Sequence, residues 1–310
     1  MKILHLNPEN DLQTAINCSD ADIFYLKNGV YNQKVEIVRD NVTIIGEGPE
    51  TKITFADFAT KIHADGKEYN TFRTYTLCVT GNNVKLENFT VENSNTSPEK
   101  VGQCVALSVH GNNFVALNMN LISTQDTLFL SPFPDELVVR YRGFIPQRQL
   151  YREGGNLHLF KNCKIAGTVD FIFGCSEAYF KDCEIISLKD ARDYGFVAAP
   201  AHHLAESHGF TFIDCNFKCG GANPKTVYLA RPWRDFGKCS FLNCNLEEHI
   251  DSELFDKWND TERDKSARFN YYSLASGHRL APVPWSNELT KEQAEDIINE
   301  CTQKFNKFNI

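Results

Sequence analysis

The sequence has no long hydrophobic run and no excess of positive charge. No apolar stretch approaches the ~20 residues that a helix needs to span a bilayer. The formal net charge is −8, with 32 Lys and Arg against 40 Asp and Glu. This balance argues against a nucleic-acid partner, because proteins that bind nucleic acids normally carry a basic patch. A polysaccharide partner is still possible.

A recognisable leader and a zinc-binding pattern are also missing. The start, MKILHLNPENDLQTAI, lacks the apolar middle and small-residue cleavage site of a signal peptide. Eleven cysteines are present, but they form no C-x-x-C pair and no Cys/His cluster. An odd count in a 310-residue chain is atypical of a secreted disulfide framework. We therefore expect reduced cysteines, no bound metal and a cytoplasmic protein.

Several of the cysteines belong to a repeat. Four segments share Phe, any residue, Asn or Asp, Cys, any residue and an apolar residue: LFKNCKI, YFKDCEI, TFIDCNF and SFLNCNL. Their cysteines are Cys163, Cys183, Cys215 and Cys244. Recurrence every 20 to 50 residues is typical of a solenoid. The alternation inside each unit indicates short strands, because side chains of a strand alternate with period two.

Short strands that return to one position in every coil predict an all-β parallel β-helix. We expect Asn or Asp to stack at a bend, and Cys and Phe to fill the interior. The open ends of a solenoid need caps. Helical spacing at 10–16 predicts an N-terminal cap, and a capping box at Thr290 and Gln293 predicts a helical cap at about 287–310. Without a linker, the chain reads as a single domain, 1–310.

Polar residues interrupt the strand pattern at four places. Gln103 begins one apolar run, Gln125 and Asp126 precede another, Asp170 stands inside GTVDFIFG, and Arg231 follows a strand. Each has an ordinary explanation when taken alone, since an acid on a strand is usually solvated.

The two aspartates are 44 residues apart, with an irregular insertion at 131–155 between them. Without the insertion they would lie about one coil apart, because coils stack at ~4.8 Å. Neighbouring carboxylates repel and titrate apart, which supplies one ionised group and one acid.

Four blocks in this order, GQCVAL, QDTLFL, GTVDFIFG and LARPW, resemble the signature of the pectin methylesterase (pectinesterase) family of carbohydrate esterases. Supporting matches are GVYNQKVEI and the stretch from WND to ARFNYYSLASG. The resemblance covers about residues 1–285. It implies a right-handed single-stranded parallel β-helix with short helices at both ends.

The resemblance also implies the chemistry, which is hydrolysis of galacturonate methyl esters in pectin or methylated oligogalacturonides, with release of methanol. It needs no metal or organic cofactor, no nucleic acid and no membrane, and we expect a monomer. By position, the family's nucleophile corresponds to Asp170, and its general acid, which later acts as base, corresponds to Asp126. The glutamines that stabilise the oxyanion correspond to Gln125 and Gln103, and the arginine that orients the nucleophile corresponds to Arg231. The residues of the substrate-binding groove correspond to Trp233, Phe173 and Arg234.

Some positions depart from the family pattern, and other functions stay open. Gln33 replaces a usual Glu and is expected to be structural, and Tyr271 changes one rim of the groove. The alternatives are an acetyl or thioester hydrolase on the same scaffold, a non-catalytic oligogalacturonide-binding solenoid, or a pectate lyase, which usually needs calcium held by several acids. Without a leader, we hypothesise that the substrates are imported, partly methylated oligogalacturonides.

Overall fold

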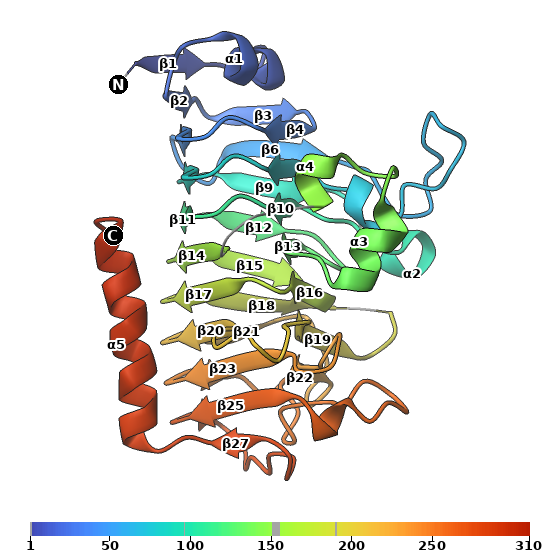
Figure 1. Cartoon of the computed structure of the whole chain (residues 1–310), viewed down its shortest axis with the longest axis vertical. Helices are drawn as coiled ribbons and strands as arrows, with labels where there is room; N and C mark the ends of the chain where they lie inside the picture. The colour runs from blue at the N-terminus through green and yellow to red at the C-terminus, as the bar shows by residue number, and fades with distance from the viewer. Residues whose placement is uncertain (1, 96, 151–155, 190) are drawn as a thin grey trace.

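The computed structural model describes residues 2–95, 97–150, 156–189 and 191–310. In this part of the chain the backbone winds into coils that stack along the molecule (Figure 1). The strands of successive coils form three parallel sheets. Each sheet contributes one short strand to most coils, and strands of successive coils pair in parallel. The predicted parallel β-helix is confirmed.

The first sheet has eleven strands: β1 (Ile3–Leu6), β2 (Ile23–Leu26), β5 (Thr43–Gly46), β8 (Lys85–Glu87), β11 (Phe114–Leu117), β14 (Leu157–Lys161), β17 (Glu177–Lys181), β20 (Phe210–Ile213), β23 (Lys238–Leu242), β25 (Arg268–Tyr272) and β27 (Asn287–Glu288). The second has nine: β3 (Gly29–Asn32), β6 (Thr51–Phe55), β9 (Thr90–Asn93), β12 (Asn120–Ile122), β15 (Lys164–Gly167), β18 (Glu184–Leu188), β21 (Asn216–Gly220), β24 (Asn245–Leu246) and β26 (Ala275–Ser276).

The third sheet has seven strands: β4 (Val35–Ile37), β7 (Leu77–Val79), β10 (Leu107–Val109), β13 (Leu128–Leu130), β16 (Val169–Gly174), β19 (Gly195–Pro200) and β22 (Val227–Ala230). The helices are α1 (Leu12–Cys18), α2 (Pro98–Val101), α3 (Asp135–Tyr141), α4 (Gln147–Leu150) and α5 (Lys291–Lys307), with 3₁₀ turns at Thr71–Arg73 and Arg263–Lys265. None of the described helices is long and apolar enough to span a membrane.

The repeat noted in the sequence forms the bend between the first and second sheets. Its Asn or Asp residues adopt a left-handed conformation, with φ of 54° to 55° at Asn162, Asp182, Asp214 and Asn243. Asn and Asp tolerate this region better than other non-glycine residues. The cysteine that follows each of them is fully buried. The expected division, with Asn or Asp at the bend and Cys inside, is confirmed.

Phenylalanines of the same repeat stack inside the solenoid. The ring centroids of Phe160 and Phe180 are 4.8 Å apart, those of Phe180 and Phe212 4.6 Å, and those of Phe212 and Phe241 4.8 Å, with interplanar angles of 14°, 10° and 1°. This spacing is that of the coils themselves, because strands of a sheet lie ~4.8 Å apart. One phenylalanine from each of these four coils therefore helps to align them along a common axis.

The N-terminal helix α1 closes the first coil. Asp11 precedes it and accepts a hydrogen bond from the Thr14 amide at 2.6 Å. Gln33 holds the start of the helix, since its Oε1 accepts from the Leu12 amide at 2.7 Å and its Nε2 donates to the Asn10 carbonyl at 2.8 Å. Gln33 is therefore structural, as its position in the sequence suggested.

The C-terminal helix α5 begins with the expected capping box, formed by Thr290 and Gln293. It runs along the flank of the eleven-stranded sheet, from β27 back towards β11 (Figure 1). The buried side chains of Ala294, Cys301 and Phe305 pack against that sheet. The outer surface of this sheet is thus covered by the C-terminal helix between β11 and β27.

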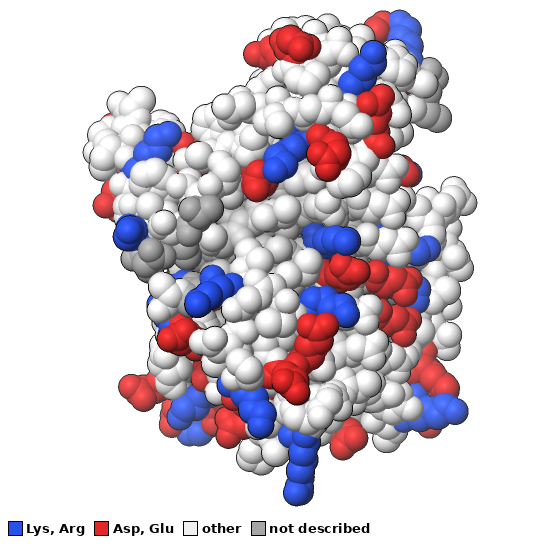
Figure 2. Space-filling model, turned by 180° about the vertical axis from the view of Figure 1, so that it is seen from behind, with Lys and Arg blue, Asp and Glu red and all other residues white. Residues whose placement is uncertain are grey.

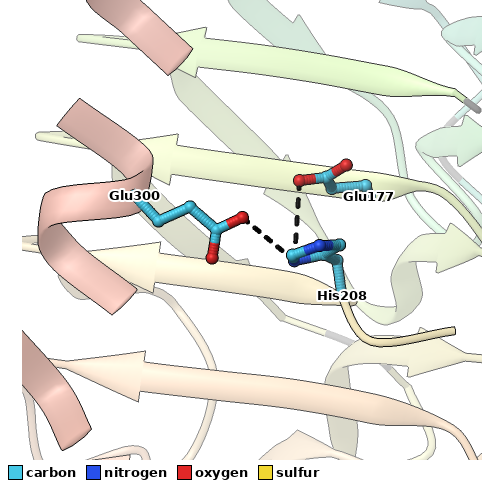
Figure 3. Close-up of side chains that lie close together, drawn as sticks. All are labelled: Glu177, His208 and Glu300. Atoms are coloured by element: carbon cyan, nitrogen blue, oxygen red, sulfur yellow. Dashed lines mark ion pairs between the residues drawn. The ribbon is translucent and has the colours of Figure 1, made fainter. Parts of the chain in front are cut away.

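Ion pairs add to this apolar contact (Figure 3). His208 Nδ1 lies 3.3 Å from Glu300 Oε1 on α5 and 3.7 Å from Glu177 Oε1 on β17. Lys304 of α5 pairs with both glutamates. On the face of the molecule seen in Figure 2, basic and acidic side chains are interspersed.

The insertion at 131–155 differs from the prediction, because it is not irregular throughout. It forms α3 and α4 where the structure describes it, and residues 151–155 lie outside the described residues. Leu137 and Tyr141 on α3 join a second apolar cluster with Phe72 and Phe133. The four-residue spacing of Leu137 and Tyr141 is compatible with a helix, but the segment is too short for this spacing alone to predict one.

We predict that Phe212→Ala lowers the free energy of unfolding by about 3–5 kcal/mol, because it removes a fully buried ring from the middle of the stack. Chemical denaturation followed by circular dichroism measures the change. The control is Val139→Ala on α3, whose side chain is exposed, with an expected change within about 0.5 kcal/mol. Equal effects of the two substitutions would contradict the role given to the stack.

Candidate active site

The eight residues singled out from the sequence all line one cavity of about 450 Å³. It lies over the seven-stranded sheet, on the face away from the main core. This follows from β16, where Ile172 belongs to the main core and the next residue, Phe173, belongs to the second apolar cluster. The residues are Gln103, Gln125, Asp126, Asp170, Phe173, Arg231, Trp233 and Arg234. Their roles stay predictions.

Strand register brings the two aspartates together. β13 pairs with β16 so that Leu128 lies opposite Ile172. The same offset places Asp126 beside Asp170, and the Asp126 amide donates to the Val169 carbonyl at 3.1 Å. Both aspartates are only 8% exposed. The expectation that they lie one coil apart agrees with this register.

An irregularity in β16 turns Asp170 out of the strand pattern. The pairing with β19 shifts between Val169 and Ile172, and Asp170 has a φ of 51°. A bulge of this kind re-aims a side chain. Asp126 also has a left-handed backbone, with a φ of 63°. Both carboxylates therefore stand at local breaks of the sheet, which ordinary alternation does not predict.

Arg231 binds Asp170 through two parallel hydrogen bonds. Its Nε donates to Oδ1 at 2.8 Å and its Nη2 to Oδ2 at 2.7 Å. A bidentate pair of this type fixes both the position and the plane of the carboxylate. The guanidinium carbon lies 3.7 Å from the ring centroid of Phe196 and 3.9 Å from that of Trp258. The arginine itself is thus held by two aromatic rings.

The environment separates the two carboxyl groups electrostatically. Burial raises the pKa of Asp126 well above its usual range, and the charge of Asp170 raises it further. Burial also raises the pKa of Asp170, but the hydrogen bonds and charge of Arg231 oppose this. Asp126 therefore keeps its proton to higher pH, while Asp170 is the group that ionises first.

The two glutamines are positioned through their backbones. The Gln103 carbonyl accepts from the Ala59 amide at 3.0 Å, and the Gln125 carbonyl accepts from the Cys104 amide at 3.1 Å. The side chain of Gln125 has a further partner, because Arg192 Nη1 donates to its Oε1 at 3.0 Å. Two amides beside a carboxylate pair can donate to a negatively charged oxygen.

The rest of the cavity wall comes from aromatic residues and from the insertion. The rings of Phe173 and Trp233 meet edge to face, with centroids 5.7 Å apart. Arg234 pairs with Glu136 on α3 and donates to the Trp233 carbonyl at 2.6 Å. Three residues of α3 also line the cavity: Leu137, Arg140 and Tyr141. The insertion is therefore part of the site.

Three neighbours of the residues predicted to be catalytic were not themselves predicted from the sequence. Trp258 begins the quoted WND block but carried no assigned role. Phe196 and Arg192 stand in a stretch without a motif, and they reach the site only because β19 is the next strand of the sheet. Their contribution depends on three-dimensional packing, so no spacing in the sequence could reveal it.

Among the described residues, one group has the composition and proximity to hold a metal ion: Glu177, His208 and Glu300 (Figure 3). None of the three lines the cavity. The ammonium group of Lys304 already forms ion pairs with both glutamates there. This arrangement suits an ion-pair cluster that holds α5 to the sheet.

Comparison with known proteins shows the relationship directly. The profile of the family described as Pectinesterase matches residues 10–133 and 137–305. A pectinesterase of Petunia integrifolia is 31% identical over 296 residues, which cover 91% of this chain and 70% of the petunia protein.

Two solved structures have the same fold. Pectin methylesterase PemA from Erwinia chrysanthemi superposes with a TM-score of 0.76 at 22% identity, over 95% of this chain and 94% of PemA. A pectin methylesterase in complex with a hexasaccharide also gives a TM-score of 0.76, at 23% identity, over 92% of this chain and 90% of that one. The chain therefore belongs to the pectinesterase family, whose members are carboxylic ester hydrolases that demethylesterify pectin.

Proposed function

We propose that the protein hydrolyses galacturonate methyl esters by an aspartyl esterase mechanism, with Asp170 as nucleophile. The observation that carries this proposal is the bidentate Arg231–Asp170 pair next to a second buried aspartate, Asp126. The pair supplies an oriented anion and its neighbour supplies a proton. Simple sugar binding needs neither.

In the first half of the reaction, a carboxylate oxygen of Asp170 attacks the C6 carbonyl carbon of the ester. The negative charge that develops on the carbonyl oxygen is received by the amides of Gln103 and Gln125. Donors of this type typically contribute a few kcal/mol each to the barrier. Asp126 gives its proton to the departing methoxy oxygen, so that methanol leaves and an acyl-enzyme remains.

In the second half, ionised Asp126 takes a proton from water as the water oxygen attacks the acyl carbon. The bond to Asp170 breaks, and the product leaves as a galacturonate carboxylic acid. Asp126 is again protonated and Asp170 again ionised, as alternating acid and base roles require. Arg231 keeps Asp170 in the plane and position for attack throughout, which compensates for the weak nucleophilicity of a carboxylate.

We propose partly methylated oligogalacturonides as the substrates. The insertion helix α3 forms one wall of the cavity, and a wall of this kind favours a short chain over a long polymer. Trp233 and Phe173 offer apolar ring surfaces for sugar faces, and Arg234 stands beside Trp233. The solved relative in complex with a hexasaccharide supports a saccharide ligand in this groove.

We also propose that the protein acts in the cytoplasm. All eleven cysteines are free, and nine of them are buried in the solenoid or under α5. Unpaired thiols in this number suit a reducing compartment, where disulfides rarely form. The monomeric state stays a prediction.

The test of the nucleophile is methanol release by the wild type and by Asp170→Asn. We expect the substitution to lower kcat at least about 10³-fold, and Asp126→Asn to lower it about 10²–10⁴-fold, because each loses one proton-transfer or bond-forming role. The matched control is Asp182→Asn, at an exposed bend where Asn stands in other coils. Its activity should equal that of the wild type.

The outcomes are distinct. Full activity in folded Asp170→Asn would contradict its assignment as nucleophile. Release of acetate without methanol from acetylated, methylated substrate would favour an acetyl esterase instead.

A second prediction concerns substrate length. We expect kcat/KM for methylated oligogalacturonides of three to six units to exceed that for polymeric pectin, when both are expressed per methyl ester. The reason is that α3 forms one wall of the cavity and leaves less room for a long chain than for a short one. Equal kcat/KM values for the two substrates would contradict the proposed substrate. Recovery of the protein in the medium and not in the cell fraction would contradict the proposed location.

A third prediction concerns pH. Activity needs Asp170 ionised and Asp126 protonated, so kcat/KM should rise with pH through the pKa of Asp170 and fall through that of Asp126. Both pKa values are raised, so both limbs should lie above the ~3.9 of an ordinary aspartate. The residual activity of Asp126→Asn should lack the alkaline limb. Its persistence in this variant would assign that limb to another group.

A further inference from the structure

We infer that Arg192 is a positioning residue of this reaction, which holds the Gln125 amide so that its NH₂ group faces the developing oxyanion. This inference rests on the proposed function. Arg192 does not line the cavity, whereas Gln125 does. Arg192 therefore acts through the glutamine and does not touch the substrate.

The hydrogen bond between them determines which way the amide points. A glutamine side chain has one end that only accepts and one end that only donates. Arginine can only donate, and its Nη1 lies 3.0 Å from Gln125 Oε1. The contact therefore fixes the oxygen towards Arg192. The opposite end carries two hydrogens, so it can donate both to the neighbouring Asp126 carboxyl, with which Gln125 also forms a hydrogen bond, and to an oxygen that gains negative charge.

The turn that carries Arg192 is itself held in place. Asn223 donates to the Asp193 carboxylate at 2.9 Å, and the Gly195 amide donates to the Thr226 carbonyl at 3.0 Å. Gly195 begins β19, which pairs with β16, the strand that carries Asp170. The chain directly after Arg192 is thus held relative to the strand that carries Asp170, which is what a positioning role requires.

A row of side chains also connects the two arginines of the site. The guanidinium carbon of Arg192 lies 5.8 Å from the ring centroid of Tyr194. The Tyr194 and Phe196 centroids are 5.8 Å apart, and Phe196 lies against Arg231. Tyr194, just before β19, and Phe196 on β19 therefore contact both the donor to Gln125 and the partner of Asp170.

The charge of Arg192 has a second effect. It lowers the pKa of both Asp126 and Asp170 electrostatically, against the effect of burial. Loss of the charge should therefore move both limbs of the pH profile to higher pH, which loss of a merely structural contact would not do.

The experiment is a double-mutant cycle between Arg192→Met and Gln125→Ala, read as kcat and KM for a methylated oligogalacturonide. We expect Arg192→Met to lower kcat about tenfold with KM changed less than about twofold, and to raise both pKa values of the profile. In the Gln125→Ala background the same substitution should change kcat less than about twofold, because its target amide is gone. Arg192→Lys should restore the pH limbs and part of kcat.

The control is Lys189→Gln, which removes one positive charge from an exposed position of the same connection and should leave kcat and the pH profile unchanged. Equal kcat losses from Arg192→Met in both backgrounds, or unchanged pH limbs, would overturn the inference while the esterase assignment stands. A wild type that releases no methanol would overturn the proposed function and the inference with it.

Discussion

Parallel hydrogen bonding between successive coils is the constraint on which the whole site depends. It places residues that are distant in sequence at one fixed spacing, so that Asp126 and Asp170 meet across β13 and β16. The same pairing brings β19 and β22 alongside, and with them Phe196 and Arg231. The stacked phenylalanines and buried cysteines of the interior hold this spacing constant. The side chains of the site on the outer face of the sheet are therefore held at the same regular spacing as the residues of the core.

The site buries two carboxyl groups and offsets the cost of burial for one of them with an arginine. Two carboxyl groups almost hidden from water would both tend to stay neutral. One of them has a bidentate arginine and the other has none, so that a single environment yields an ionised group and an acid. The arginine is held in turn by Phe196 and Trp258. The difference between the two aspartates thus depends on aromatic residues that contact Arg231 and not the carboxyl groups themselves.

The sequence was sufficient for the parts of this protein that repeat or that form motifs. The recurrent Asn or Asp followed by Cys predicted the bends and the interior, and the capping box predicted the start of α5. The eight residues of the motif blocks gather around one cavity. By contrast, Arg192 and Phe196 belong to no motif, and α3 is too short for the spacing of its two buried apolar residues to predict a helix. Such contacts are specified by the assembled coils and not by any local pattern.

The placement of α3 and α4 has a consequence for how groove shape and catalysis can vary. The insertion leaves the solenoid after β13 and returns before β14, yet β14 pairs with β11 and β16 with β13 without a change of register. A connection between two coils can therefore lengthen, shorten or be exchanged while the carboxylates keep their spacing. Groove length and chemistry are separable in this architecture, so that a lineage, or an engineer, can replace the wall and retain the reaction.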